Sequence, residues 1–228
     1  AASGIGKAIA IKLWQEGVTV LAGDIQEDAL QRLSEAFPGI TGFSLDVTDA
    51  HSVARFFQQP EVAGACWLVN NAGVYPGRNL FEYTPQEIWQ LVQVNNIGAV
   101  WCTQQFAQPL LQSQRNGAIV NISSVSGQHG SSDAIYGMTK AALLGFTKST
   151  AISFAPYIRV NAVAPGLVNT GILNRVPEKR LQELRRNERL ETPITPEAVA
   201  DAVYFLLSDQ ARHITGATLD VNNGQYMR

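Results

Sequence analysis

Short apolar runs that alternate with amphipathic stretches constrain the fold of this chain more than any other feature. The runs are rich in β-branched side chains, as buried strands are, and the stretches between them carry apolar residues at helical spacing. The predicted strands are Val18–Gly23, Ile40–Val47, Cys66–Asn70, Ala118–Ile122, Ile158–Val163 and Thr218–Val221. The predicted helices are Gln26–Phe37, Ala50–Gln59, a long one from Pro85 towards Pro109, Ala134–Phe154 and Pro196–Ser208. Strands separated by helices predict one doubly wound α/β domain over residues 1–228, a parallel sheet with helices on both faces.

Charge and cysteine content exclude several classes of function. The formal net charge is −2 over 228 residues, so no overall field attracts nucleic acid or an anionic membrane surface. No apolar run approaches the ~20 residues that a helix needs to span a bilayer. Cys66 and Cys102 are far apart in the sequence, which argues against a metal site and against a disulfide scaffold. Free thiols are typical of a reducing compartment, so we expect a cytoplasmic protein without a bound metal.

The first residues, Ser3-Gly4-Ile5-Gly6, form a phosphate-binding pattern that runs into a predicted helix. Glycines let the backbone approach a pyrophosphate, and the free N–H groups at the start of a helix attract an anion. A Walker-type loop is the rival interpretation. It fails because Ala1 stands where its first glycine belongs and Ala8 where a hydroxyl would bind magnesium. The pattern therefore favours a dinucleotide-binding domain of the Rossmann type.

Asp24 strengthens this interpretation. It follows an apolar strand and lies 18 positions after Gly6, close to the ~20-residue spacing of the carboxylate that binds the adenosine ribose. An acid there repels a 2′-phosphate, and neither Ser3 nor Ile25 is basic, so the sequence favours NAD over NADP. The alternative is an aspartate that caps the next helix.

The phosphate-binding turn of such a domain is fed by a strand, and nothing strand-like stands before Ala1. Without that strand, two strands of the sheet would have unpaired backbone groups. We therefore expect the natural protein to have a strand before Ala1.

Tyr136 and Lys140 are spaced i, i+4 on a predicted helix, so both project from one face. A nearby ammonium favours the phenolate, so the sequence predicts a lowered pKa for Tyr136 that suits general acid/base catalysis. Ser124 stands 12 residues earlier, at the carboxyl end of a predicted strand, where ligands bind in open parallel sheets.

Taken together, these pieces resemble the short-chain dehydrogenase/reductase family along nearly the whole chain. The resemblance is carried, in order, by Ser3-Gly4-Ile5-Gly6, Asp46-Val47, Asn70-Asn71-Ala72-Gly73, Asn95, Ser124, Tyr136 with Lys140, Pro165-Gly166 with Thr170, Pro196 to Ala200, and Thr215-Gly216. It implies a hydride transfer between NAD(H) and a secondary alcohol or ketone. It also implies a homo-oligomer, a tetramer, that pairs through the long helices Pro85–Gln108 and Ala134–Phe154.

The resemblance also implies a role for each site residue. Tyr136 would exchange the proton with the substrate oxygen, and Ser124 would hydrogen-bond that oxygen. Lys140 would hold the nicotinamide ribose, and Asn95 would bend its helix and keep a water in a proton relay. The cofactor would be bound by Ser3, Gly4, Ile5, Gly6, Asp24, Ile25, Asp46, Val47, Asn71, Ala72, Gly73, Tyr136, Lys140, Pro165, Gly166, Val168 and Thr170.

Other positions and functions stay open. The polar stretch Asn174–Glu191 is either a solvated helix or a mobile cover over the ligand, and the resemblance favours a substrate lid over residues 171–192. His129 is either a pocket residue or a solvated loop residue. A dinucleotide-binding regulatory module without catalysis is one alternative function. A hydrolase that uses Ser124 and His129 is another, disfavoured because no Gly-x-Ser-x-Gly elbow surrounds Ser124.

Overall fold

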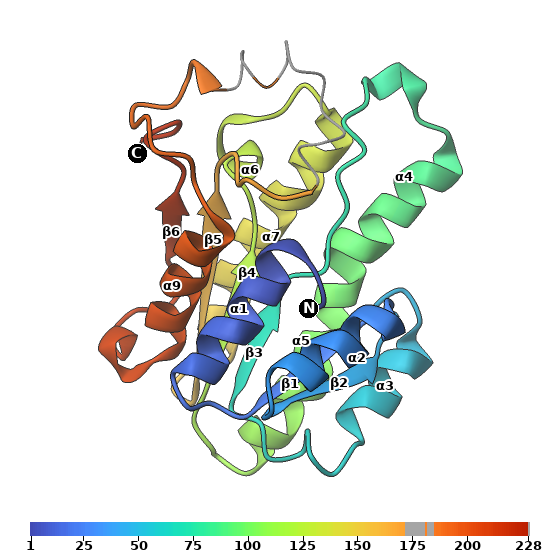
Figure 1. Ribbon diagram of the computed structural model, residues 1–228, viewed down its shortest axis with the longest axis vertical. Helices are drawn as coiled ribbons and strands as arrows, with labels where there is room; N and C mark the ends of the chain where they lie inside the picture. The colour runs from blue at the N-terminus through green and yellow to red at the C-terminus, as the bar shows by residue number, and fades with distance from the viewer. Residues whose placement is uncertain (172–180, 182–184, 228) are drawn as a thin grey trace.

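The computed structural model describes residues 1–171, 181 and 185–227. Strands and helices alternate through them, as the sequence predicts (Figure 1). In chain order the elements are α1 (Gly4–Gln15), β1 (Val20–Asp24), α2 (Glu27–Ala36), β2 (Ile40–Ser44), α3 (Ala50–Phe57), β3 (Trp67–Asn70), the 3-10 turn η1 (Leu80–Glu82), α4 (Pro85–Val92), the π-helical turn η2 (Gln93–Ile97), α5 (Gly98–Gln112), β4 (Gly117–Ile122), α6 (Ser126–His129), α7 (Ala134–Ser153), β5 (Ile158–Pro165), α9 (Pro196–Leu207), the 3-10 turn η4 (Asp209–Ala211) and β6 (Thr218–Val221). Most of the predicted lid lies outside the described residues.

All strand pairs in the described part of the chain are parallel. One sheet has the order β3-β4-β5-β6, and a second consists of β1 and β2. In the larger sheet Trp67 lies opposite Ala118 and Gly117 lies opposite Ile158. Because the strands are parallel, their carboxyl ends meet at one edge, where ligands bind in such sheets.

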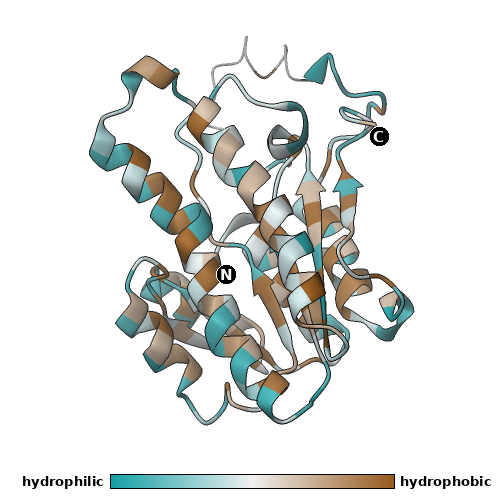
Figure 2. Ribbon diagram, turned by 180° about the vertical axis from the view of Figure 1, so that it is seen from behind, coloured by the Kyte–Doolittle hydropathy of each residue, from teal (hydrophilic) through white to brown (hydrophobic). Residues whose placement is uncertain are grey.

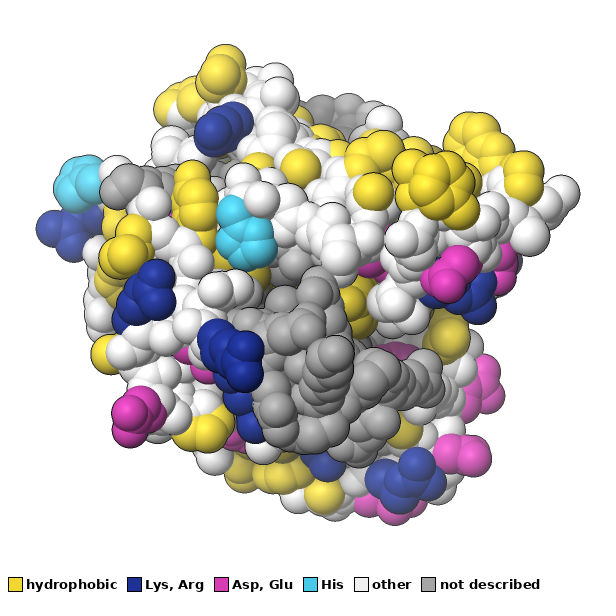
Figure 3. All heavy atoms as spheres, turned by 90° about the horizontal axis from the view of Figure 1, so that it is seen from above, with side chains coloured by type: hydrophobic (Ala, Val, Ile, Leu, Met, Phe, Trp, Pro, Cys, Tyr) yellow, Lys and Arg dark blue, Asp and Glu magenta, His cyan; other side chains and the backbone are white. Residues whose placement is uncertain are grey.

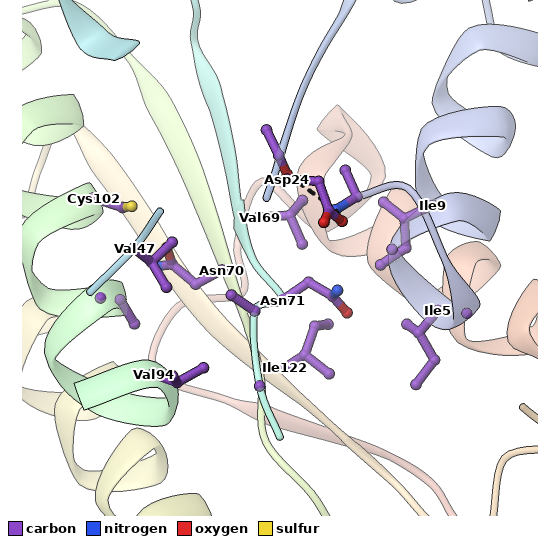
Figure 4. A pocket seen from close by; sticks show the side chains of 18 of the residues that line it. Ile5, Ile9, Asp24, Val47, Val69, Asn70, Asn71, Val94, Cys102 and Ile122 are labelled. Atoms are coloured by element: carbon purple, nitrogen blue, oxygen red, sulfur yellow. Dashed lines mark hydrogen bonds and ion pairs between the residues drawn. The ribbon is translucent and has the colours of Figure 1, made fainter. Parts of the chain in front are cut away.

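The strands of the described residues form two separate sheets. Among the described residues, β1 pairs with β2 alone, and the outer edge of β3 has no strand beside it. A cavity lies along both strands, lined by Val20 and Ala22 of β1 and by Trp67 and Val69 of β3. Side chains of α1 and β3 face this space (Figure 4).

Helices cover both faces of the larger sheet, which confirms the predicted fold class. α1 and α9 lie side by side on one face (Figure 1), and α5 and α7 cover the other face (Figure 2). On the first face Ile9 and Val203 pack with Val120 in one apolar cluster. On the second, Phe106 and Leu110 of α5 belong to another. β4 and β5 lie in the middle and are almost entirely buried, which fits their apolar sequences.

Local signals account for the helix that leads towards the site. Thr84 caps α4 together with Glu87 in a capping box, and Pro85 occupies the first turn. The sequence predicts one long helix to Pro109. The structure instead inserts a π-helical turn at Gln93–Ile97, and α5 continues past Pro109 to Gln112. π-helical turns are frequent at functional sites.

Candidate active site

One cavity of about 2120 Å³ lies at the carboxyl ends of the strands and extends between β1 and β3. The predicted site residues that line it are Ser3, Gly4, Ile5, Gly6, Asp24, Ile25, Asp46, Val47, Asn71, Ala72, Gly73, Ser124, Tyr136, Lys140, Pro165, Gly166, Val168 and Thr170. Among the predicted site residues, Asn95 alone is not on this wall. Figure 4 shows Ile5 of α1, Asp24 of β1 and Asn71 after β3 around the same space. Segments far apart in the sequence therefore meet at one site.

Tyr136 stands in the first turn of α7, where Asp133 caps the helix. Asp133 Oδ1 accepts a hydrogen bond from the Tyr136 backbone N–H at 3.0 Å. Tyr136 and Ser124 both line the cavity. Burial raises the pKa of Tyr136 to about 12, and the nearby Ser124 hydroxyl only partly opposes this. The lowered pKa that the sequence predicts is therefore wrong for this structure, because burial outweighs every favourable contact.

Lys140 lies one turn further along α7 and is almost fully buried, with 5% of its surface exposed. Its Nζ donates a hydrogen bond to the Ile122 carbonyl oxygen at 2.9 Å. It lies 5.8 Å from the centroid of the Tyr136 ring. Burial lowers the pKa of Lys140 to about 8. The Lys140 side chain thus reaches the same cavity wall as Tyr136, but in this structure its charge does not lower the pKa of Tyr136.

Asn95 lies in the π-helical turn and is 1% exposed. Its Oδ1 accepts from the Val74 backbone N–H at 2.8 Å, and its Nδ2 donates to the Val74 carbonyl and to Thr139 Oγ1. A Cβ added at Gly73 would lie 3.3 Å from Lys140 Nζ and 3.4 Å from Asn95 Oδ1. Asn95 is therefore behind the cavity wall, close to Lys140, and ties the loop after β3 to α7.

The start of α1 fits a diphosphate. Gly4 has a φ of +51°, which favours glycine, and the Ser3 side chain makes no capping hydrogen bond to the helix. A Cβ at Gly6 would lie 2.7 Å from Asn71 Nδ2 and 3.0 Å from the Cα of Ala1. Only glycine allows this close approach, so the N–H groups of the first turn stay open to an anion on the cavity wall.

Asp24 lines the cavity, but its carboxylate already has backbone partners. Oδ2 accepts from the Ala2 backbone N–H at 2.8 Å, and Oδ1 accepts from the Gln26 backbone N–H at 3.1 Å. The carboxylate therefore binds both the phosphate-binding turn and the residue that precedes α2.

Sequence reasoning missed several residues of the cavity wall. Tyr75 and Pro76 follow β3, and Gln225 belongs to the C-terminal segment. The Tyr75 ring meets the Tyr136 ring edge-on, with centroids 4.7 Å apart. These residues lie in irregular segments, where neither periodicity nor spacing marks a position. An aromatic residue shortly after the Asn-Ala-Gly sequence is the only signal that could have indicated Tyr75.

His129 lies at the end of α6 and lines the cavity. Its ring centroid is 6.3 Å from that of Tyr226. The Ser124 Oγ accepts from the Ser126 backbone N–H. Within the residues described, His129 makes no hydrogen bond to Ser124, so the pair lacks the contact that a hydrolase needs.

In the described part of the chain, no helix combines the length and the apolar character needed to cross a membrane.

A family model described as enoyl-(acyl carrier protein) reductase matches residues 1–225. A 3-oxoacyl-(acyl-carrier-protein) reductase of Thermotoga maritima is 37% identical, over 98% of this chain and 94% of its own length. A (3R)-3-hydroxyacyl-CoA dehydrogenase of Canis lupus familiaris is 34% identical, over 100% of this chain and 94% of its own length.

Solved structures agree with these relatives. A short-chain glucose/ribitol dehydrogenase of Brucella melitensis superposes with a TM-score of 0.92 at 25% identity, covering 100% of this chain and 94% of that one. A 3-oxoacyl-(acyl-carrier protein) reductase of the same species superposes with a TM-score of 0.91 at 32% identity, covering 100% and 89%. The chain therefore belongs to the short-chain dehydrogenase/reductase family, oxidoreductases that act on CH–OH groups with a nicotinamide dinucleotide.

Proposed function

We propose that the protein transfers a hydride between NAD(H) and a secondary alcohol or its ketone, with Tyr136 as the general acid/base. One observation carries the proposal. Ser124, Tyr136 and Lys140 line the same large cavity, with Lys140 one helical turn after Tyr136 on α7. A regulatory module that only senses the dinucleotide has no need of such a set.

The residues of the cavity fit the dinucleotide. The open first turn of α1 would hold the diphosphate, and Asp24 would bind the adenosine ribose and disfavour a 2′-phosphate. Asp46 with Val47 would contact the adenine, and the segment from Pro165 to Thr170 would contact the nicotinamide amide. When bound, the nicotinamide ring gives or accepts the hydride.

The protein's own part is the movement of a proton. A pKa of about 12 keeps the proton on Tyr136 at neutral pH, so the phenol can donate it to a carbonyl oxygen during reduction. Ser124 would hold that oxygen by a hydrogen bond. In the oxidation direction the proton returns to Tyr136, and a relay of Lys140 and a water kept by Asn95 would carry it onward.

The names of two relatives support a choice of substrate class. Two of them are named for 3-oxoacyl and 3-hydroxyacyl thioesters. We propose a 3-oxoacyl thioester as the first ketone to assay, with simpler ketones and polyols as the comparison set. Turnover is followed by NADH absorbance.

The mechanism is tested by Tyr136→Phe, which keeps the ring and removes only the oxygen that carries the proton. Turnover should fall by at least the ~10²–10⁴-fold typical of a general acid/base, with NAD affinity nearly unchanged. Ser124→Ala should lower turnover comparably or less. A Tyr136→Phe enzyme with near wild-type turnover would end this mechanism and leave the dinucleotide-binding module.

We also propose a homo-oligomer, a tetramer, that pairs through Pro85–Gln108 and Ala134–Phe154. Trp89 on α4 is 67% exposed, and Ile152 on α7 is 81% exposed. Hydrophobic side chains also gather where η1 and α4 form the edge of the molecule (Figure 3). Exposed apolar side chains of this size are often covered by a partner.

Sedimentation velocity at micromolar concentration should give a tetramer, and Trp89→Glu should shift it to smaller species. A wild-type protein that sediments as monomer contradicts the proposal.

A further inference from the structure

The stretch from Ala72 to Gln86 is described completely, and two of its residues are not exposed: Tyr75 and Tyr83. Both reach the catalytic helix. The Tyr75 ring meets the Tyr136 ring, as described above, and the Tyr83 hydroxyl donates a hydrogen bond to Asp133 Oδ2 at 2.8 Å. An otherwise solvated loop therefore contacts the start of α7 through two aromatic side chains.

Asp133 has more partners than a helix cap requires. One oxygen, Oδ1, satisfies the Tyr136 backbone N–H, which is the ordinary task of a capping residue. The other, Oδ2, accepts from Gly77 N at 3.1 Å, from Arg78 N at 3.2 Å and from Tyr83. The side chain is 1% exposed. One carboxylate thus binds the catalytic helix with one oxygen and the loop with the other.

The backbone that Asp133 binds, at Gly77, lies directly against the Tyr75 ring. Gly77 has a φ of +70°, and a Cβ there would lie 3.4 Å from Cε1 of the Tyr75 ring. Because Asp133 fixes the backbone at Gly77, it also fixes the ring that packs beside it. Tyr75 lines the cavity next to Tyr136, whereas Asp133 is not among the lining residues.

We propose that Asp133 is a positioning residue that clamps the loop 74–83 to α7 and thereby holds Tyr75 as the wall that places the substrate carbonyl at the Tyr136 hydroxyl. This inference rests on the proposed function for its kinetic consequences. The clamp itself is a physical contact and can be tested without turnover.

The first test uses Asp133→Ser. Serine is a good helix cap, so α7 keeps its capping hydrogen bond, but a hydroxyl cannot also hold the three donors of the loop. Trypsin cleaves after Arg78, inside the clamped segment. Cleavage there, followed by mass spectrometry on the intact protein, should become about tenfold faster as the loop opens more often. Asp49→Ser is the matched control, because Asp49 caps α3 through His51 N and has no contact with the loop. An unchanged rate of cleavage after Arg78 overturns the clamp.

The second test asks whether the clamp acts through Tyr75. Asp133→Ser and Tyr75→Ala should each lower kcat/KM for the ketone about tenfold, mainly through KM, with NAD affinity unchanged. Tyr83→Phe removes one of the donors and should give a smaller loss. If Tyr75 carries the effect, the double variant Asp133→Ser/Tyr75→Ala is no worse than Tyr75→Ala alone.

The outcomes separate this inference from the proposed function. If the loss of kcat/KM in the double variant equals the product of the two single losses, Asp133 does not act through Tyr75. That result overturns the positioning role even if cleavage after Arg78 is faster. Should Tyr136→Phe stay active, the proposed function fails, while the proteolysis result still decides whether Asp133 holds the loop.

Discussion

The catalytic side of the cavity, built on β4 and α7, is far more enclosed than the nucleotide side, built on α1 and β1. Ser124 and Lys140 are 8% and 5% exposed, and each makes a hydrogen bond to the backbone. On the nucleotide side Ile25 is 68% exposed, and β1 has one strand partner among the described residues. Buried polar groups must be satisfied within the protein, so their positions are determined before any ligand binds. Polar groups exposed to solvent can instead form hydrogen bonds with water, so they stay available to a ligand.

The largest effect should come from breaking the enclosed side at Lys140. Lys140→Met keeps the length of the side chain and removes the ammonium, so turnover should fall ~10²-fold or more, and NAD affinity should fall as well because the proposed contact with the nicotinamide ribose would be lost. Steady-state kinetics and a nucleotide titration measure both. Lys148→Met, at an exposed position on the same helix, is the control and should leave both unchanged. A variant that loses NAD affinity but keeps its turnover would show that Lys140 only binds the nucleotide and takes no part in catalysis.

The burial of Lys140 also predicts a pH dependence of stability. Its pKa is about 8 in the folded protein, against 10.5 for an exposed lysine. Between these values the unfolded chain binds the extra proton, so the free energy of unfolding rises with pH. From pH 7.5 to pH 9.5, wild type should gain about 2 kcal/mol relative to Lys140→Met. Chemical denaturation of both proteins at each pH measures this. Equal pH dependence in the two proteins would mean that Lys140 is not desolvated.

The smallest effect should come from the exposed side, where a change alters ligand preference but not chemistry. In Asp24→Ala/Ile25→Arg the carboxylate that repels a 2′-phosphate is gone and a cation is added. The ratio of kcat/KM for NAD over NADP should fall about tenfold or more, with kcat little changed. Ile25→Arg alone should keep most of the NAD preference. A wild-type enzyme that prefers NADP contradicts the role of Asp24.

The sequence by itself determined the fold class, because strand and helix periodicities are local properties of the chain. β6 spans the predicted Thr218–Val221, and α7 ends one residue before the predicted boundary. The i, i+4 spacing of Tyr136 and Lys140 likewise needs only a helix to bring both side chains to one face. The turn at Ser3 to Gly6 was recognisable because glycine is required wherever backbone and ligand come close.

Only the tertiary structure decided the electrostatics and the loop contacts. The pKa of Tyr136 rises and that of Lys140 falls because packing removes water from both groups, and no spacing in the sequence reports the extent of burial. In the sequence, Asp133 is only the residue before a predicted helix. Its second oxygen binds Gly77 and Arg78, which stand more than 50 residues earlier, and such a contact arises only when the folded chain brings distant segments together.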